Sequence, residues 1–102
     1  MKEFTDDTFA DEIKTGVVLV DFWAAWCPPC RAMMPTLAAV AASFPHVKVG
    51  KVNSDECPRT SDEYAVSSLP TFKIFKDGLQ VRSHLGVISQ ADLEQMLRDA
   101  GA

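Results

Sequence analysis

The sequence predicts an α/β protein with a mixed five-stranded central sheet and four helices distributed over both faces of the sheet. Segments with strand and helix patterns alternate along the first half of the chain as β-α-β-α-β, which favours parallel crossover connections. A hairpin signal at Asp77-Gly78 in the second half adds antiparallel strands. The almost continuously apolar segment 17–23 is typical of a central strand that is buried on both faces.

Capping residues and periodicity place the elements of the first half. Thr5 or Asp6 caps the first helix, in which Phe9 and Ile13 lie four residues apart on the buried side. Pro35 lies inside the second helix and should kink it, because proline removes a main-chain hydrogen bond. The expected elements are a strand over 1–4, a helix over 5–14, a strand over 17–23, a helix over 27–44 and a strand over 46–53.

The second half adds a short helix, a hairpin and a terminal helix. Pro58 lies in the first turn of a polar helical segment over 55–64. Strands over 71–76 and 79–85 flank the hairpin turn. Ser89 and Asp92 resemble a capping box in front of the last helix.

Length, charge and cysteine count limit the functions that the chain can have. We expect one domain over residues 1–102. The net charge of −4, without any Lys/Arg cluster, argues against a nucleic-acid surface. No apolar run is long enough for a membrane span, and the acidic N-terminus does not resemble a signal peptide. Three cysteines indicate one working pair and one free thiol in a reducing compartment, so we expect a cytoplasmic protein.

The most informative motif is Cys27-Pro28-Pro29-Cys30, at the carboxyl end of the apolar strand and the start of a helix. Two cysteines at this separation on a helical turn lie on one face and can form a disulfide. A helix N-terminus offers free N–H groups and a positive partial charge, which favour the reactive thiolate. The motif therefore predicts a redox-active pair.

Two other interpretations of the pair are weighed against redox activity. Structural zinc normally takes four Cys or His ligands, whereas Cys57, His46 and His84 are isolated and not at ligand spacing. A permanent structural disulfide is disfavoured because so short a bridge constrains few unfolded conformations. Cys57 is expected to be a free thiol without a role, with a regulatory or dimer-forming thiol as the alternative.

Asp21 is the only charged residue in the apolar strand. A buried carboxylate is costly when it is charged, so its pKa should be raised. The alternative is that Asp21 points outward at the edge of the sheet or caps another element.

Several motifs carry a family resemblance: VDFWAAWC at residues 20–27, Pro35, Lys51, Leu69-Pro70-Thr71, Phe75-Lys76-Asp77-Gly78, and Gly86. From Thr5 to the C-terminus the chain resembles the thioredoxin family, with a variant WCPPC active site. The resemblance implies the thioredoxin fold and a protein-disulfide reductase. It implies that Asp21 takes a proton from Cys30 through water, with Lys51 as the modulating neighbour of Asp21. It also implies that Pro70 follows a cis peptide bond.

We expect Cys27, nearer the helix start and solvent, to be the nucleophile and the more buried Cys30 to resolve the mixed disulfide. The expected partners are protein disulfide substrates and, from the resemblance, a flavin-dependent thioredoxin reductase; we expect a monomer. No cofactor is expected, because the chain has no phosphate loop, dinucleotide fingerprint or metal cluster. Trp23 should pack under the site. The residues expected to bind substrate are Trp26, Pro28, Pro29, Leu69, Pro70, Gly86 and Val87.

The chain departs from the family at Pro28, where most thioredoxins have glycine. A double proline resembles tryparedoxins and some membrane-tethered reductases of cytochrome maturation. One alternative function is therefore a dedicated electron donor to a single peroxidase or partner system. Another is a non-catalytic interaction module, which would keep its partner after both cysteines are replaced.

Overall fold

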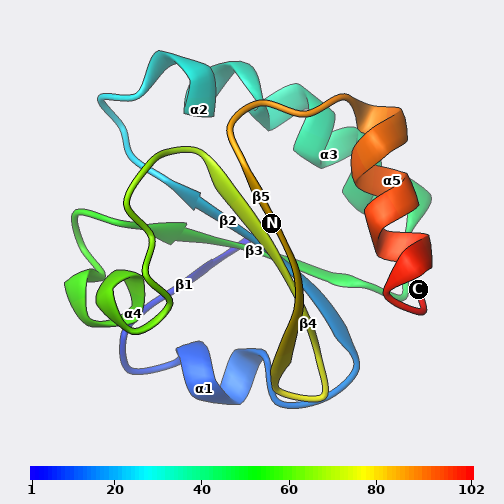
Figure 1. Cartoon of the computed structure of the whole chain (residues 1–102), viewed down its shortest axis with the longest axis horizontal. Helices are drawn as coiled ribbons and strands as arrows, with labels where there is room; N and C mark the ends of the chain where they lie inside the picture. Colours follow the sequence, from blue (N-terminus) through cyan, green and yellow to red (C-terminus); the bar gives the residue numbers. More distant parts are fainter.

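The computed structural model describes residues 1–102 and has a mixed five-stranded sheet with helices on both faces (Figure 1). The strands lie in the order β1-β3-β2-β4-β5. Their bounds are β1 (Lys2–Phe4), β2 (Val17–Trp23), β3 (Lys48–Asn53), β4 (Thr71–Lys76) and β5 (Leu79–Leu85). The predicted fold class is confirmed.

The apolar strand β2 lies at the centre of the sheet, as its composition predicts. It pairs in parallel with β3, which pairs in parallel with β1. On the other side β2 pairs antiparallel with β4, and β4 pairs antiparallel with β5. The sheet is therefore parallel where the sequence predicts crossovers and antiparallel where it predicts a hairpin.

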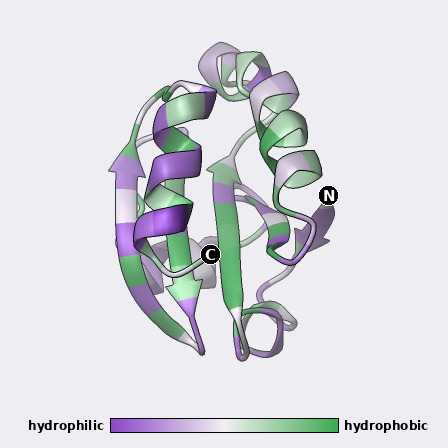
Figure 2. Cartoon of the chain, turned by 90° about the vertical axis from the view of Figure 1, so that its right-hand side faces the viewer, coloured by the Kyte–Doolittle hydropathy of each residue, from purple (hydrophilic) through white to green (hydrophobic).

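Helices cover the sheet on both faces (Figure 1). One face is covered by α2 (Pro28–Ala32), α3 (Met34–Ser43) and α5 (Gln90–Asp99); the other is covered by α1 (Phe9–Glu12) and α4 (Pro58–Glu63). The two faces bury separate apolar clusters, one around Leu19 and Leu37 and the other around Phe9 and Phe22. Figure 2 shows the apolar strands in green between the helices, and hydrophilic positions on the outer side of the C-terminal helix.

The predicted second helix is divided into α2 and α3 at Met33. Pro35 is in the first turn of α3 and has no N–H to donate to the carbonyl group four residues earlier. The kink is confirmed, and its position separates the short helix that carries the cysteines from the long helix that packs on the core.

The first helix is shorter than predicted. Thr5 and Thr8 donate main-chain N–H groups to each other's hydroxyls and form a turn, so α1 begins only at Phe9. Thr5 caps this turn, as predicted, because its hydroxyl accepts the Thr8 N–H and its carbonyl accepts the Phe9 N–H. The N-cap residue of α1 itself is Thr8, which makes no side-chain cap bond. Asp6 instead accepts hydrogen bonds from the main-chain N–H groups of Arg59 and Thr60, in the first turn of α4.

Two other elements begin later than predicted. The third strand begins at Lys48, because the Val47 N–H donates to the Phe44 carbonyl in a turn that follows α3. The fourth helix begins at Pro58, because Asn53 Oδ1 accepts the Asp55 N–H at 3.0 Å and holds a turn before the helix.

The turn and cap signals of the last third are confirmed. Asp77 and Gly78 both have positive φ, at 50° and 89°, as a two-residue type I′ hairpin requires. Ser89 is the N-cap of α5, and its hydroxyl accepts the Asp92 N–H at 3.1 Å. None of the helices combines the length and the apolar character that crossing a bilayer requires.

Candidate active site

The strand registers bring four loops together at the edge of the sheet where β2 and β3 end. Trp23 at the end of β2 pairs with Asn53 at the end of β3, and Phe22 pairs with Thr71 at the start of β4. Thr71 in turn pairs with Leu85 at the end of β5. The loops that follow β2, β3 and β5, and the loop that precedes β4, therefore meet at this edge.

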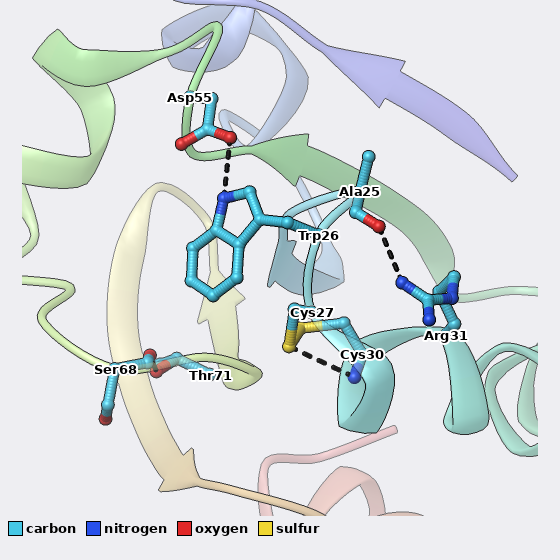
Figure 3. The surroundings of a disulfide bond; sticks show 8 residues. All are labelled: Ala25, Trp26, Cys27, Cys30, Arg31, Asp55, Ser68 and Thr71. Atoms are coloured by element: carbon cyan, nitrogen blue, oxygen red, sulfur yellow. Dashed lines mark hydrogen bonds between the residues drawn. A yellow bond between two sulfur atoms is a disulfide. The ribbon is translucent and has the colours of Figure 1, made fainter.

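The two cysteines of this edge form a disulfide with a Cα–Cα distance of 5.3 Å (Figure 3). Cys27 is the N-cap residue of α2, and its sulfur accepts the main-chain N–H of Cys30 at 3.3 Å. Pro28 and Pro29 occupy the two positions between them and have no N–H. The Cys30 N–H is therefore the first donor of this helix, and it points at the Cys27 sulfur.

Both cysteines are buried in this disulfide form. Cys27 keeps 3% of its surface exposed and Cys30 none, so the difference in exposure is smaller than the sequence interpretation assumed. The pair forms a small apolar cluster with Ala24, against which Trp23 and Leu69 pack. Trp23 therefore lies beside the pair, as predicted.

Asp21 lies in β2 and is completely buried, so the alternative of an outward-pointing residue is wrong. Neither of its carboxyl oxygens has a hydrogen-bond partner in the protein. Burial raises the pKa of Asp21 to about 7, against a lowering by the Lys51 charge and a smaller raising by the Glu3 charge. The carboxyl group can therefore gain or lose a proton near neutral pH.

Lys51 is the register partner of Asp21 on the neighbouring strand β3. Its ammonium group lies 3.2 Å from Glu3 Oε2 and 4.8 Å from the centre of the Trp23 ring. The lysine is therefore a neighbour of the buried acid, as the resemblance implies, but its ion pair is with Glu3.

The loop that precedes β4 lies beside the cysteine pair. The Leu69–Pro70 peptide bond is cis, as the resemblance implies. The Thr71 hydroxyl donates to the Ser68 carbonyl at 2.6 Å, and the Gly86 N–H donates to the Pro70 carbonyl at 2.8 Å. These bonds hold the loop together and fasten it to the loop that follows β5.

Large apolar side chains remain exposed around this edge. Trp26 is 66% exposed and Val87 60%, and the prolines of the cysteine motif are exposed as well. Leu69 is half-buried against the cysteine cluster. Leu85, 65% exposed at the end of β5, extends this surface and was not predicted from the sequence.

Two polar residues of the site were also missed. Asp55 Oδ2 accepts the Trp26 indole N–H at 2.8 Å, and the Arg31 guanidinium donates to the Ala25 carbonyl at 2.7 Å (Figure 3). Together they fix the loop that carries Trp26 from both sides. Arg31 follows Cys30 directly, so its position was a usable signal, whereas Asp55 reaches Trp26 only through the tertiary fold.

The remaining candidate residues lie outside this arrangement. Cys57 is buried, its thiol donates to the Phe4 carbonyl at 3.6 Å, and burial raises its pKa, which favours the unreactive thiol. The His46 ring lies 6.0 Å from the Phe44 ring, and His84 Nε2 lies 3.1 Å from the Val87 carbonyl oxygen. No three His, Cys, Asp or Glu side chains are grouped as they would be to hold a metal ion.

Comparisons with known proteins agree on one family. The family model described as Thioredoxin matches residues 1–99. Thioredoxin of Chlamydia trachomatis is 43% identical over 93 residues, which is 91% of each chain. Thioredoxin 1 of a Nostoc species is 41% identical over 98 residues, covering 93% of this chain and 92% of the relative.

Solved structures give the same result for the fold. A structure of Plasmodium falciparum thioredoxin has a TM-score of 0.90 and 30% identity, covering 97% of this chain and 98% of its own. Oxidised mitochondrial thioredoxin 3 of Saccharomyces cerevisiae also has a TM-score of 0.90, with 32% identity and coverage of 97% and 94%. The cysteine pair, the fold and the sequence matches agree: the chain belongs to the thioredoxin family, whose members are thiol–disulfide oxidoreductases.

Proposed function

We propose that the chain reduces protein disulfides with Cys27 as nucleophile and Cys30 as resolving thiol. The observation that carries this assignment is the Cys30 N–H, which donates to the Cys27 sulfur at the start of α2. In the reduced protein the same donor and the helix terminus stabilise a thiolate on Cys27. Cys30 follows as the third residue of the helix and is fully buried.

The reaction transfers two electrons in two exchange steps. The Cys27 thiolate attacks one sulfur of the substrate disulfide, forming a mixed disulfide and releasing the first substrate thiolate. The Cys30 thiol then loses its proton and attacks the Cys27 sulfur, which releases the second substrate thiolate. The substrate is reduced to a dithiol and the Cys27–Cys30 pair is oxidised to the disulfide.

Asp21 is the proposed acceptor of the Cys30 proton, through a water molecule. Its burial and its pKa of about 7 support this role, because the group can change its protonation state at neutral pH. Lys51, on the neighbouring strand, modulates how easily Asp21 holds that proton.

The proposed docking surface is the apolar surface around the pair, in which Trp26, Pro28, Pro29, Leu85 and Val87 are exposed and Leu69 and Gly86 are half-buried. Pro70 is buried in this structure, so its side chain lies beneath the surface to which the sequence assigned it. We propose that the Leu69 main chain pairs with an extended segment of the substrate, which the packing of Leu69 against the cysteine cluster supports. The surface accounts for protein substrates in general, because apolar packing and main-chain pairing require no particular sequence.

Membership in the thioredoxin family also supports proposals for the electron source, the oligomeric state and the location of the protein. The proposed electron source is a flavin-dependent thioredoxin reductase, which returns the disulfide to the dithiol. We propose that residues 1–102 form a single domain and that the protein is monomeric and cytoplasmic. In this proposal the protein uses no cofactor of its own.

Removing the Asp55 side chain tests the docking surface. Asp55→Ala is expected to lower kcat/KM for a protein disulfide such as insulin about threefold to tenfold, mainly through KM, because the Trp26 indole loses its only hydrogen bond. Reduction of a small aromatic disulfide should change little. Asp62→Ala removes the same charge from an exposed site on α4 and is the matched control. Equal losses on both substrates would show that Asp55 does not act through docking.

The reaction itself is tested by coupling the protein to NADPH and thioredoxin reductase with insulin as acceptor. A thioredoxin should be re-reduced and should turn over insulin continuously. Re-reduction without turnover of insulin would instead indicate a dedicated donor to one partner system. Retention of partner binding with no turnover in any assay would indicate an interaction module.

A further inference from the structure

Three charged residues form a row across the parallel half of the sheet. Glu3 on β1 pairs in register with Lys51 on β3, and Lys51 pairs in register with Asp21 on β2. Register partners on one face of a sheet bring their side chains side by side. Figure 1 shows the three strands adjacent in this order.

Lys51 stands between two carboxyl groups but forms an ion pair with only one of them. Its ammonium group lies 3.2 Å from Glu3 Oε2, whereas both oxygens of Asp21 lack any hydrogen-bond partner. The Trp23 ring, 4.8 Å from the ammonium group, adds a second contact in this position. The lysine is thus held at the half-exposed Glu3 and leaves the fully buried Asp21 without a counter-ion.

Few other titratable groups face Asp21. Cys27 and Cys30, at the start of α2, do not titrate while they form the disulfide, and the charges that shift the pKa of Asp21 are those of Lys51 and Glu3. From β5 comes His84, which lies beyond Phe72, the register partner of Asp21 on β4. No charged side chain occurs in α3, and Arg31 points to the Ala25 carbonyl.

We propose that Glu3 is a positioning residue of the active site, which holds the Lys51 ammonium group away from Asp21 and so keeps the buried acid free to carry a proton. This inference rests on the proposed role of Asp21 as proton acceptor. It gives the edge strand β1 a part in the chemistry, although β1 contains neither the cysteine pair nor Asp21. It also explains why a lysine next in register to the acid does not neutralise it.

The charges around Asp21 act in the direction that this inference requires. The Lys51 charge lowers the pKa of Asp21 and the Glu3 charge raises it. Removing Glu3 would delete the raising charge and release the lysine toward Asp21, so both changes lower the pKa. Wild-type Asp21 should consequently be protonated over a wider pH range than Asp21 in a variant without Glu3.

The test follows the Asp21 carboxyl carbon by NMR during a pH titration of the oxidised protein, in which neither active-site cysteine titrates. Glu3→Gln is expected to lower the titration midpoint by about 0.5 to 1 pH unit. Glu3→Asp, which keeps the carboxylate, should lower it less. Asp7→Asn removes an exposed carboxylate paired with Arg59 and should leave the midpoint unchanged. A midpoint that is unaffected by Glu3→Gln overturns the inference.

A double variant distinguishes the positioning of Lys51 by Glu3 from a direct effect of the Glu3 charge on Asp21. Lys51→Met should raise the Asp21 midpoint, and Glu3→Gln should then have a much smaller effect than in the wild type. An equal effect in both backgrounds would show that Glu3 acts on Asp21 directly, and would overturn the positioning role.

The pH profile of insulin turnover provides the second readout. We expect the profile of Glu3→Gln to move to lower pH together with the NMR midpoint. A lowered midpoint with an unmoved profile would keep the Glu3 inference and refute the proposed role of Asp21 instead.

Discussion

Replacing Cys27 by serine is expected to lower disulfide reduction by about 10³-fold or more, to the uncatalysed background, because the attacking thiolate is lost. Cys30→Ser is expected to stop turnover while leaving the first attack intact. The mixed disulfide then persists, because serine cannot attack the Cys27 sulfur. Intact-mass measurement and non-reducing electrophoresis after incubation with a disulfide protein would detect the trapped adduct.

The third cysteine provides the control for this pair of variants. Cys57 is buried in the other half of the core, so Cys57→Ser should keep turnover and trap nothing. Adducts found with Cys27→Ser and absent with Cys30→Ser would reverse the assigned roles. This outcome would also mean that the Cys30 N–H on the Cys27 sulfur does not decide which thiol attacks.

Replacing Asp21 by asparagine is expected to stabilise the oxidised protein above neutral pH. The pKa of Asp21 is raised from 3.8 to about 7 by burial, so the folded state binds a proton that the unfolded state has already released. Wild-type stability should therefore fall as pH rises from about 4 to 7. A shift of this size corresponds to about 4 kcal/mol as an upper bound.

The asparagine variant lacks this pH-dependent loss. Its buried amide has the same unpaired surroundings as the acid, which costs about 1–3 kcal/mol at any pH. The same cost applies to the neutral acid, so we expect Asp21→Asn to be close to wild type in stability at pH 4 and about 1–3 kcal/mol more stable at pH 8. Urea unfolding at several pH values gives the free energy of unfolding of each protein. In the difference between variant and wild type, plotted against pH, the contributions of other titrating groups cancel. A flat difference curve would mean that Asp21 is not an acid with a raised pKa.

Asp21→Asn should lower turnover, although it raises stability above neutral pH. Without the carboxyl group, Cys30 has no proposed proton acceptor, and the resolving step should slow most at neutral pH and least at alkaline pH. A variant that is stabilised and yet resolves the mixed disulfide at the wild-type rate would leave Asp21 as a buried acid without a catalytic role.

Much of the site was predictable because its signals are local in the sequence. The cysteine pair and its helix start lie within four residues, and Asp21 is conspicuous as the only charged residue of an apolar strand. Asp77 and Gly78 determine their own turn, because both need positive φ. In each case the residues that decide the structure are neighbours along the chain.

The features that were missed depend on contacts between distant segments. Asp55 binds Trp26 across 29 positions, and Asp6 caps a helix that begins more than 50 residues later. The Glu3–Lys51 pair exists only because β1 adds to the sheet in one particular register. A register cannot be deduced from a three-residue strand, since so short a segment carries little periodicity.

The predicted start of the first helix was wrong for a different reason. Thr5 and Thr8 satisfy their main-chain groups with each other's side chains, so a local turn replaces the first helical turn. Both residues are also common helix caps, and composition alone does not separate the two outcomes.

The most direct test of the central claim is the reduction potential of the Cys27–Cys30 pair, measured by equilibration with dithiol and glutathione buffers and followed through the fluorescence of Trp23 and Trp26. The central claim is that this pair is a reductant of protein disulfides. It predicts a potential near that of thioredoxin, roughly −270 mV. A potential near −120 mV would make the pair an oxidant and would contradict the account.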